Sequence, residues 1–161
     1  MISLEEFIKA TKEHDVLNAF APHHLERLAA LAKAVRFSRN QIIFREGARH
    51  GFFYLILDGS VVLELATTGR SVLLQTLHSG DAMGWSSLLS GDGGAHFEAR
   101  ALTPVHALAF EGSKLREACE SDPAFGYRMT KSLLTLLAER LDASRLQLMD
   151  IYSSKPGAAR A

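Results

Sequence analysis

The spacing of apolar residues changes twice along the chain and divides it into helical ends and a β-rich middle. Residues 3–13 and 22–34 carry apolar side chains at intervals of three and four, as at Leu4 and Ile8, and this predicts two short helices. Over residues 35–110 the apolar residues occur in short runs rich in β-branched and aromatic side chains. Helical spacing returns after this stretch, so the chain is expected to be mainly β with flanking helices.

The apolar runs in the middle of the chain predict β-strands, and most are separated by glycine, asparagine or aspartate. The predicted strands cover residues 35–37, 42–44, 52–57, 61–65, 72–77, 96–101 and 106–110. Short strands at such regular spacing are typical of an antiparallel barrel or sandwich and not of a parallel α/β sheet.

The last predicted helix is the longest. Ser113 is expected to cap a short helix, and Asp122 to cap a long one that starts at Pro123 and reaches about residue 152. We expect the first half of the long helix to dock on its own chain and the second half to pair with a second copy, giving a homodimer; docking along its whole length is the alternative. The expected dimer seam consists of Leu134, Leu137, Leu141, Ser144, Leu148 and Ile151.

Composition sets limits on location and partners. The chain of 161 residues has 18 basic and 18 acidic side chains, so no overall charge marks it as a nucleic-acid binder. No apolar run approaches the roughly 18 residues of a membrane span, and the N-terminus lacks the features of a signal peptide. We therefore expect one cytoplasmic domain over residues 1–152, with no membrane association, and a disordered tail over residues 153–161.

The segment 80–101 gives the clearest indication of function. Gly84 would let the backbone approach a ligand closely, and Ser86 and Ser87 would place hydroxyl groups beside the free N–H groups of a helix start, which is a natural anion site. No arginine or lysine lies between Gly80 and Glu98. The sequence therefore predicts an anion cradle that has no cation within its own segment.

Catalytic and metal-binding patterns are missing from the sequence. The seven histidines include no His-x-His or His-x-x-x-His pair, and there is no Gly-x-Ser-x-Gly motif. The single cysteine, Cys119, lies in a charged stretch without an obvious base, and a structural role suits it best. We therefore expect a protein that is not an enzyme and has no metal site.

Three local motifs carry a resemblance to a known family: Ile-Ile-Phe-Arg-Glu-Gly at 42–47, Phe-Tyr-Leu-Ile-Leu-Asp-Gly-Ser-Val at 53–61 and Leu-His-Ser-Gly-Asp at 77–81. With the order of elements over 16–152, they resemble the cyclic-nucleotide-binding domain of catabolite-activator-type (Crp/Fnr-like) regulators. The resemblance implies an antiparallel β-roll, a double-stranded β-helix of jelly-roll type. Family members that control transcription carry a DNA-binding domain of some 70 residues after the dimer helix. Fewer than ten residues follow Tyr152, which implies a stand-alone form that does not bind nucleic acid directly and whose output passes through a protein partner or through the dimer itself.

The resemblance also implies a binding site, from which this chain departs. In the family a glutamate follows the cassette glycine and bonds the ribose, and an arginine about eleven residues after that glycine pairs with the cyclic phosphate. Gly84 matches, but Trp85 takes the position of the glutamate, Ala95 that of the arginine, and His96 follows. Losing both contacts would weaken binding of cyclic AMP by roughly a hundredfold to ten-thousandfold.

This departure leaves three alternative interpretations of the function. The first is a ligand-sensing regulatory module in which Trp85 stacks on a cyclic nucleotide or another small anionic ligand, with protonated His96 as a candidate cation. The alternative is a ligand-free dimeric interaction or scaffold module in which Trp85 plugs the pocket, a burial contributing up to about 4 to 6 kcal/mol. A minor alternative is a haem-based sensor with His96 or His78 as axial ligand.

Overall fold

The computed structural model describes residues 2–12, 14, 16–49, 51–89 and 94–154. Helices lie at both ends of the chain and strands in the middle, as the apolar spacing predicts. In chain order the elements are α1 (Leu4–Thr11), α2 (Pro22–Leu31), β1 (Ala32–Phe37), β2 (Ile42–Phe44), β3 (Phe52–Asp58), β4 (Val61–Thr67), β5 (Arg70–Leu77), β6 (Ala82–Met83), the 3-10 turn η1 (Trp85–Leu88), β7 (Glu98–Ala101), β8 (Val105–Glu111), α3 (Gly112–Ser121) and α4 (Pro123–Ser153).

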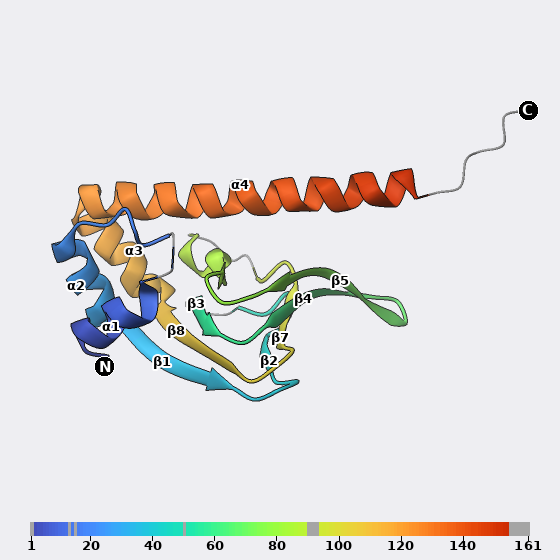
Figure 1. Cartoon of the computed structure of the whole chain (residues 1–161), viewed down its shortest axis with the longest axis horizontal. Helices are drawn as coiled ribbons and strands as arrows, with labels where there is room; N and C mark the ends of the chain where they lie inside the picture. Colours follow the sequence, from blue (N-terminus) through green and yellow to red (C-terminus); the bar gives the residue numbers. More distant parts are fainter. Residues whose placement is uncertain (1, 13, 15, 50, 90–93, 155–161) are drawn as a thin grey trace, which may run out of the picture.

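The strands form two four-stranded antiparallel sheets, ordered β1-β8-β3-β6 and β2-β7-β4-β5. This confirms the predicted fold class of an antiparallel β-roll with N-terminal helices and a long C-terminal helix. Figure 1 shows α1, α2 and α3 gathered near the start of α4, with the β-roll extending below that helix. The β4–β5 hairpin extends in the same direction as the C-terminal half of α4.

Strand β3 shows how the sequence builds two cores. Its side chains alternate between faces, as in any strand. Phe53 and Leu55 belong to the core that the helices cover, whereas Tyr54 and Ile56 belong to the core between the sheets. Because both faces are covered, β3 is a nearly continuous apolar run with four successive buried residues.

The turn between β3 and β4 requires glycine. Gly59 has a φ of +92°, and a Cβ there would lie 2.3 Å from the carbonyl oxygen of Pro104. Both the left-handed backbone and the close approach exclude a side chain. Gly69, in the β4–β5 turn, has a φ of +83° but nothing within 4 Å of the position of a Cβ.

Two predicted helix boundaries are wrong and one is confirmed. Ser113 does not cap α3: the helix begins at Gly112, whose N–H donates to the Gly51 carbonyl at 2.7 Å. Helix α2 ends at Leu31, because Ala32 already pairs with β8 as the first residue of β1. Asp122 caps α4 as predicted, its carboxylate accepting the N–H of Phe125 at 3.2 Å.

Helix α4 has two different halves. Its first half docks on the chain through buried side chains, including Phe125, Met129 and Leu136. Residues 141–153 are all exposed. Docking of the first half therefore agrees with the prediction, while pairing of the second half with another copy stays a prediction. Of the predicted tail, residues 155–161 lie outside the described residues.

Candidate functional site

The predicted anion cradle is a tight turn that uses its own polar groups. Gly84 has a φ of +79° and precedes η1. The Ser87 N–H donates to the Gly84 carbonyl at 3.0 Å, and the Ser87 hydroxyl donates to the same oxygen at 2.7 Å. Ser87 is buried and Ser86 partly buried. The Ser87 hydroxyl therefore stabilises the turn and does not offer its proton to a ligand in this arrangement.

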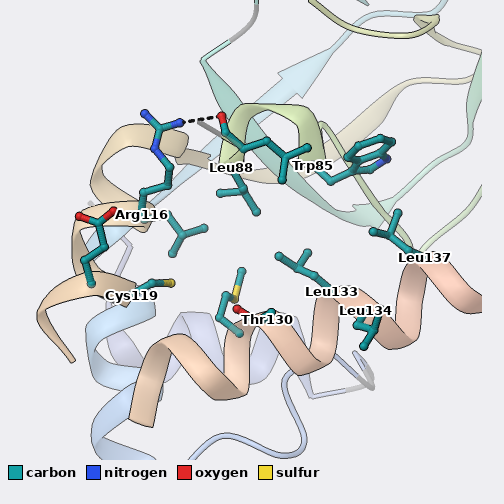
Figure 2. A pocket seen from close by; sticks show the side chains of 12 residues that line it. Trp85, Leu88, Arg116, Cys119, Thr130, Leu133, Leu134 and Leu137 are labelled. Carbon is teal, nitrogen blue, oxygen red and sulfur yellow. Dashed lines mark hydrogen bonds between the residues drawn. The ribbon is translucent and has the colours of Figure 1, made fainter. Parts of the chain in front are cut away.

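Arg116 of α3 fixes the other end of η1. Its Nη1 donates to the carbonyl of Ser87 at 2.9 Å and to that of Leu89 at 3.2 Å, the second bond being drawn in Figure 2. These bonds satisfy carbonyls at the end of the turn that have no partner within it. The backbone that presents Trp85 is thus held at both ends.

The remaining predicted site residues divide into two groups. Ala95 is buried in the core between the sheets, and its backbone pairs with that of Gly47 and Ala48. Its methyl group offers nothing polar to a ligand. His96 is exposed and stacks on Trp85, with ring centroids 5.7 Å apart and planes inclined by 26°. The structure therefore brings together Trp85 and His96 but directs Ala95 into the core.

Trp85 lines two cavities. The first, of about 430 Å³, lies between η1, α3 and α4 and has mainly apolar walls, including Leu88, Leu115 and Leu133. In Figure 2 the indole extends from η1 toward α4, where Leu137 lies. The Cys119 thiol borders this cavity, and burial raises the pKa of that thiol, which is consistent with the predicted structural role.

The second cavity is the candidate binding site. It has a volume of about 570 Å³, within the roughly 300 to 1,000 Å³ of ordinary ligand sites. Trp85 and Phe97 supply aromatic surface, Gln75 of β5 an amide, and Arg140 of α4 a cation. The cavity therefore joins the predicted cradle, the sheet and the long helix.

Arg140 is the functional candidate that the sequence does not reveal. Its Nη1 and Nη2 atoms are buried, and neither has a hydrogen-bond partner among the described residues. Burial lowers the pKa of the guanidinium, an effect that the charge of Asp81 opposes. Asp81 and Arg140 both line a smaller cavity of about 340 Å³ next to the candidate site. In the sequence Arg140 resembles the other charged residues that flank the helix seam, so only the tertiary structure identifies it.

Arg100, the other cation near the predicted segment, is already paired. Its Nη2 and Nε donate to the Glu64 carboxylate at 2.8 and 3.2 Å, and its Nη1 donates to Asn40 at 3.3 Å. The bonds to Glu64 raise the pKa of Arg100 further. Its positive charge is balanced at the surface of the sheet, in contrast to that of Arg140.

The predicted dimer seam borders the two cavities. Leu134 lines the first cavity, Leu137 both, and the other four seam residues the second. Several seam side chains remain more than half exposed in the single chain, among them Leu134 at 66%, Leu141 at 64% and Leu148 at 55%. One face of α4 thus lines both cavities, and several of its apolar side chains remain exposed to solvent.

The part of the chain that the structure describes contains neither a cluster of metal-ligand side chains nor a helix that could span a membrane. Within these residues no group of three or more histidine, cysteine, aspartate or glutamate side chains could hold a metal ion. His78, the other candidate haem ligand, is exposed, and its Nδ1 lies 3.1 Å from the Ser60 hydroxyl. No helix among the described residues is long and apolar enough to span a bilayer.

Comparison with solved structures confirms the fold. A putative cyclic nucleotide-binding protein from Geobacter metallireducens is 24% identical, with a TM-score of 0.75 over 88% of this chain and 99% of the other. A cyclic nucleotide-binding domain from Methylobacillus flagellatus is 17% identical, with a TM-score of 0.79 over 97% and 86%. The Thermus thermophilus catabolite activator protein is 24% identical, with a TM-score of 0.68 over 86% and 62%.

Sequence comparison identifies the family. No curated protein sequence matches the chain. The model of the cyclic nucleotide-binding domain family matches residues 34–122, which is more than half of the 161 residues and includes β2 to β8. The match ends at the residue that caps α4, so Arg140 lies outside it. The chain belongs to the cyclic nucleotide-binding domain family.

Proposed function

We propose that the protein is a non-enzymatic regulatory module that senses a small nucleotide-like anion bound in the cavity of about 570 Å³ beside Trp85. The observation that carries this proposal is the position of the cavity between the family's β-roll and α4. A ligand there would touch the indole of Trp85, the sheet and the long helix at once. A planar ring could stack on the indole face, which is a general platform for bases.

The ligand specificity should differ from that of a domain tuned for cyclic AMP. Trp85 and Ala95 occupy the positions where the family resemblance implies glutamate and arginine. The Ser87 hydroxyl is bonded within its own turn. Cyclic AMP is therefore expected to bind weakly, and a ligand with more stacking surface to bind better.

Regulation would act through α4. The second cavity includes residues of the C-terminal half of this helix, and residues 141–153 are all exposed. A ligand can shift the position of α4 only by its difference in affinity for the two arrangements. Contacts to both the β-roll and α4 provide such a difference. A change in the exposed half of α4 would then be read by a second copy or by another protein.

The alternative in which Trp85 plugs the pocket has less support. Trp85 is partly exposed, and it lines two cavities that are each large enough for a ligand. A plug would be expected to fill the space that it closes. The uncovered apolar face of α4 would suit either function, because both use a partner.

Thermal unfolding of the whole chain tests the proposal with four probes: cyclic AMP, cyclic GMP, cyclic di-GMP and inorganic phosphate at millimolar concentration. At least one nucleotide should raise Tm, because ligands that bind only the folded state stabilise it. Ser144→Phe, which places a ring inside the second cavity, should abolish the shift. Ser153→Phe, on the same helix beyond the cavity, should keep it. Absence of any shift in the unsubstituted protein would contradict the proposal.

A further inference from the structure

Resting on this proposed function, we propose that Arg140 of α4 binds the anionic group of the ligand, so that the charge is recognised by the helix and not by the segment 84–96. The ligand class is a planar ring that carries a phosphate or carboxylate. The ring would lie against Trp85 and the oxyanion against the guanidinium. Both side chains line the same cavity of about 570 Å³.

The unpaired state of Arg140 is the main argument. An arginine stays charged at every physiological pH, and a buried charge normally has a partner because desolvation is expensive. Nη1 and Nη2 of Arg140 are both buried, yet neither donates a hydrogen bond within the described residues. Two adjacent N–H groups without partners match the two oxygens of a carboxylate or phosphate.

The surroundings of Arg140 do not supply a substitute for that anion. Asp81 acts on it through its charge, but the two side chains form neither a hydrogen bond nor an ion pair within 4.0 Å. Glu139 and Gln75 line the cavity of about 340 Å³ that Arg140 also lines, but neither forms a hydrogen bond with the Arg140 guanidinium. Asp81 is itself engaged, its carboxylate accepting the N–H of His78 at 2.8 Å.

The position of Arg140 also provides the cation that the predicted anion cradle lacks in its own segment. No arginine or lysine lies between Gly80 and Glu98, and Arg100 is bonded to Glu64. Arg140 brings a charge to the same cavity from a distant part of the chain. An anion bound to it would hold α4 at a fixed place relative to Trp85. Ligand charge, and not only ligand shape, would then determine the position of the helix.

The test compares Arg140→Met with Arg145→Met in the whole chain. Arg145 lies on the same helix but is exposed and paired with Asp142 at 3.6 Å, so it controls for loss of a charge on α4. We would measure Tm without ligand and the dissociation constants of cyclic AMP, adenosine and inorganic phosphate by isothermal titration calorimetry. Adenosine carries the same base as cyclic AMP but no phosphate.

Without ligand, Arg140→Met should raise Tm by about 2 to 8 °C, because it removes an unpaired buried charge while keeping most of the volume. The unsubstituted protein should bind cyclic AMP about 10- to 100-fold more tightly than adenosine, the contribution of charge-assisted hydrogen bonds. Arg140→Met should abolish that preference and leave adenosine binding unchanged. Arg145→Met should change neither the Tm without ligand nor the preference for cyclic AMP over adenosine.

Two outcomes would overturn the assignment while leaving the proposed function intact. The first is a fall in Tm for Arg140→Met, which would show that the guanidinium has a structural partner in the protein. The second is an unchanged preference for cyclic AMP over adenosine in Arg140→Met, which would place the anion elsewhere. If no nucleotide raises the Tm of the unsubstituted protein, the proposed function fails and the assignment fails with it.

Discussion

Trp85 is the residue whose removal best separates ligand binding from plugging. It is partly exposed and lines two cavities, so Trp85→Ala should lower the free energy of unfolding by about 1 to 2 kcal/mol. Phe110→Ala serves as the control, because Phe110 is 1% exposed, and its loss should cost about 3 to 5 kcal/mol. Chemical denaturation measures both values. Equal losses for the two variants would favour the plug.

Asp122 caps helix α4 and also contacts helix α2. Its carboxylate accepts from Phe125 N–H and lies 3.2 Å from Nε2 of the buried His24. Asp122→Ala should lower Tm by about 2 to 4 °C. Ser113→Ala is the control, because Ser113 makes no cap, and it should leave Tm within about 1 °C. Differential scanning calorimetry distinguishes the two, and equal changes would contradict the assigned cap.

Asp122 also gives stability a pH dependence. The hydrogen bond from Phe125, followed by the charge of His24 and Arg27, lowers the pKa of Asp122 below its ordinary value. A lowered pKa in the folded state means that the stabilisation is present above the unfolded pKa and disappears as pH falls through the folded one. The difference in stability between Asp122→Ala and the unsubstituted protein should therefore become smaller as the pH falls. A difference that widened instead would show that another group dominates.

Residues differ in how far the sequence reveals their role. Asp122 followed by Pro123 is a local signal, and the cap was predictable from it. Ser113 carries the same kind of signal, but α3 begins at Gly112 with Glu111 at the N-cap position, two residues before the predicted cap. The burial of Arg140 depends on how α4 lies over the roll. No local pattern contains that information.

At the scale of elements, the turns between successive strands differ in how strictly they require glycine. Gly59→Ala should destabilise the protein by at least about 2 kcal/mol, because its left-handed backbone is combined with the approach to the Pro104 carbonyl. Gly69→Ala should cost only about 1 kcal/mol, because its left-handed turn has open space. Equilibrium unfolding in urea measures the two. Similar losses would mean that the contact with Pro104 contributes nothing.

Most strands were predictable because their side chains alternate or form continuous apolar runs between turn residues. β3 is an example, since its buried residues serve two cores. The two-residue strand β6 was not predictable, because Ala82–Met83 is too short to show a period and is identified only by pairing with Tyr54 and Leu55. The end of α2 was also missed, because Ala32 suits a helix locally but pairs with Phe110 in the sheet.

At the scale of the whole molecule, the exposed half of α4 predicts a homodimer. Leu141→Asp combined with Leu148→Asp should yield a monomer, since both side chains are more than half exposed on the predicted seam. Leu146→Asp combined with Met149→Asp adds the same charge to exposed positions outside the seam and should leave the dimer intact. Light scattering gives the mass of each. Dissociation by both pairs, or by neither, would contradict a dimer formed through this seam.

The central claim is that a ligand binds beside Trp85, and the fluorescence of this residue tests it most directly. Trp85 is the only tryptophan in the chain, so its emission reports the site without a label. Titration with the nucleotide that raises Tm most should change the emission in a saturable way. The same titration of Ser144→Phe should give no change. An emission that stays constant at millimolar concentrations of every probe would contradict a ligand site at Trp85.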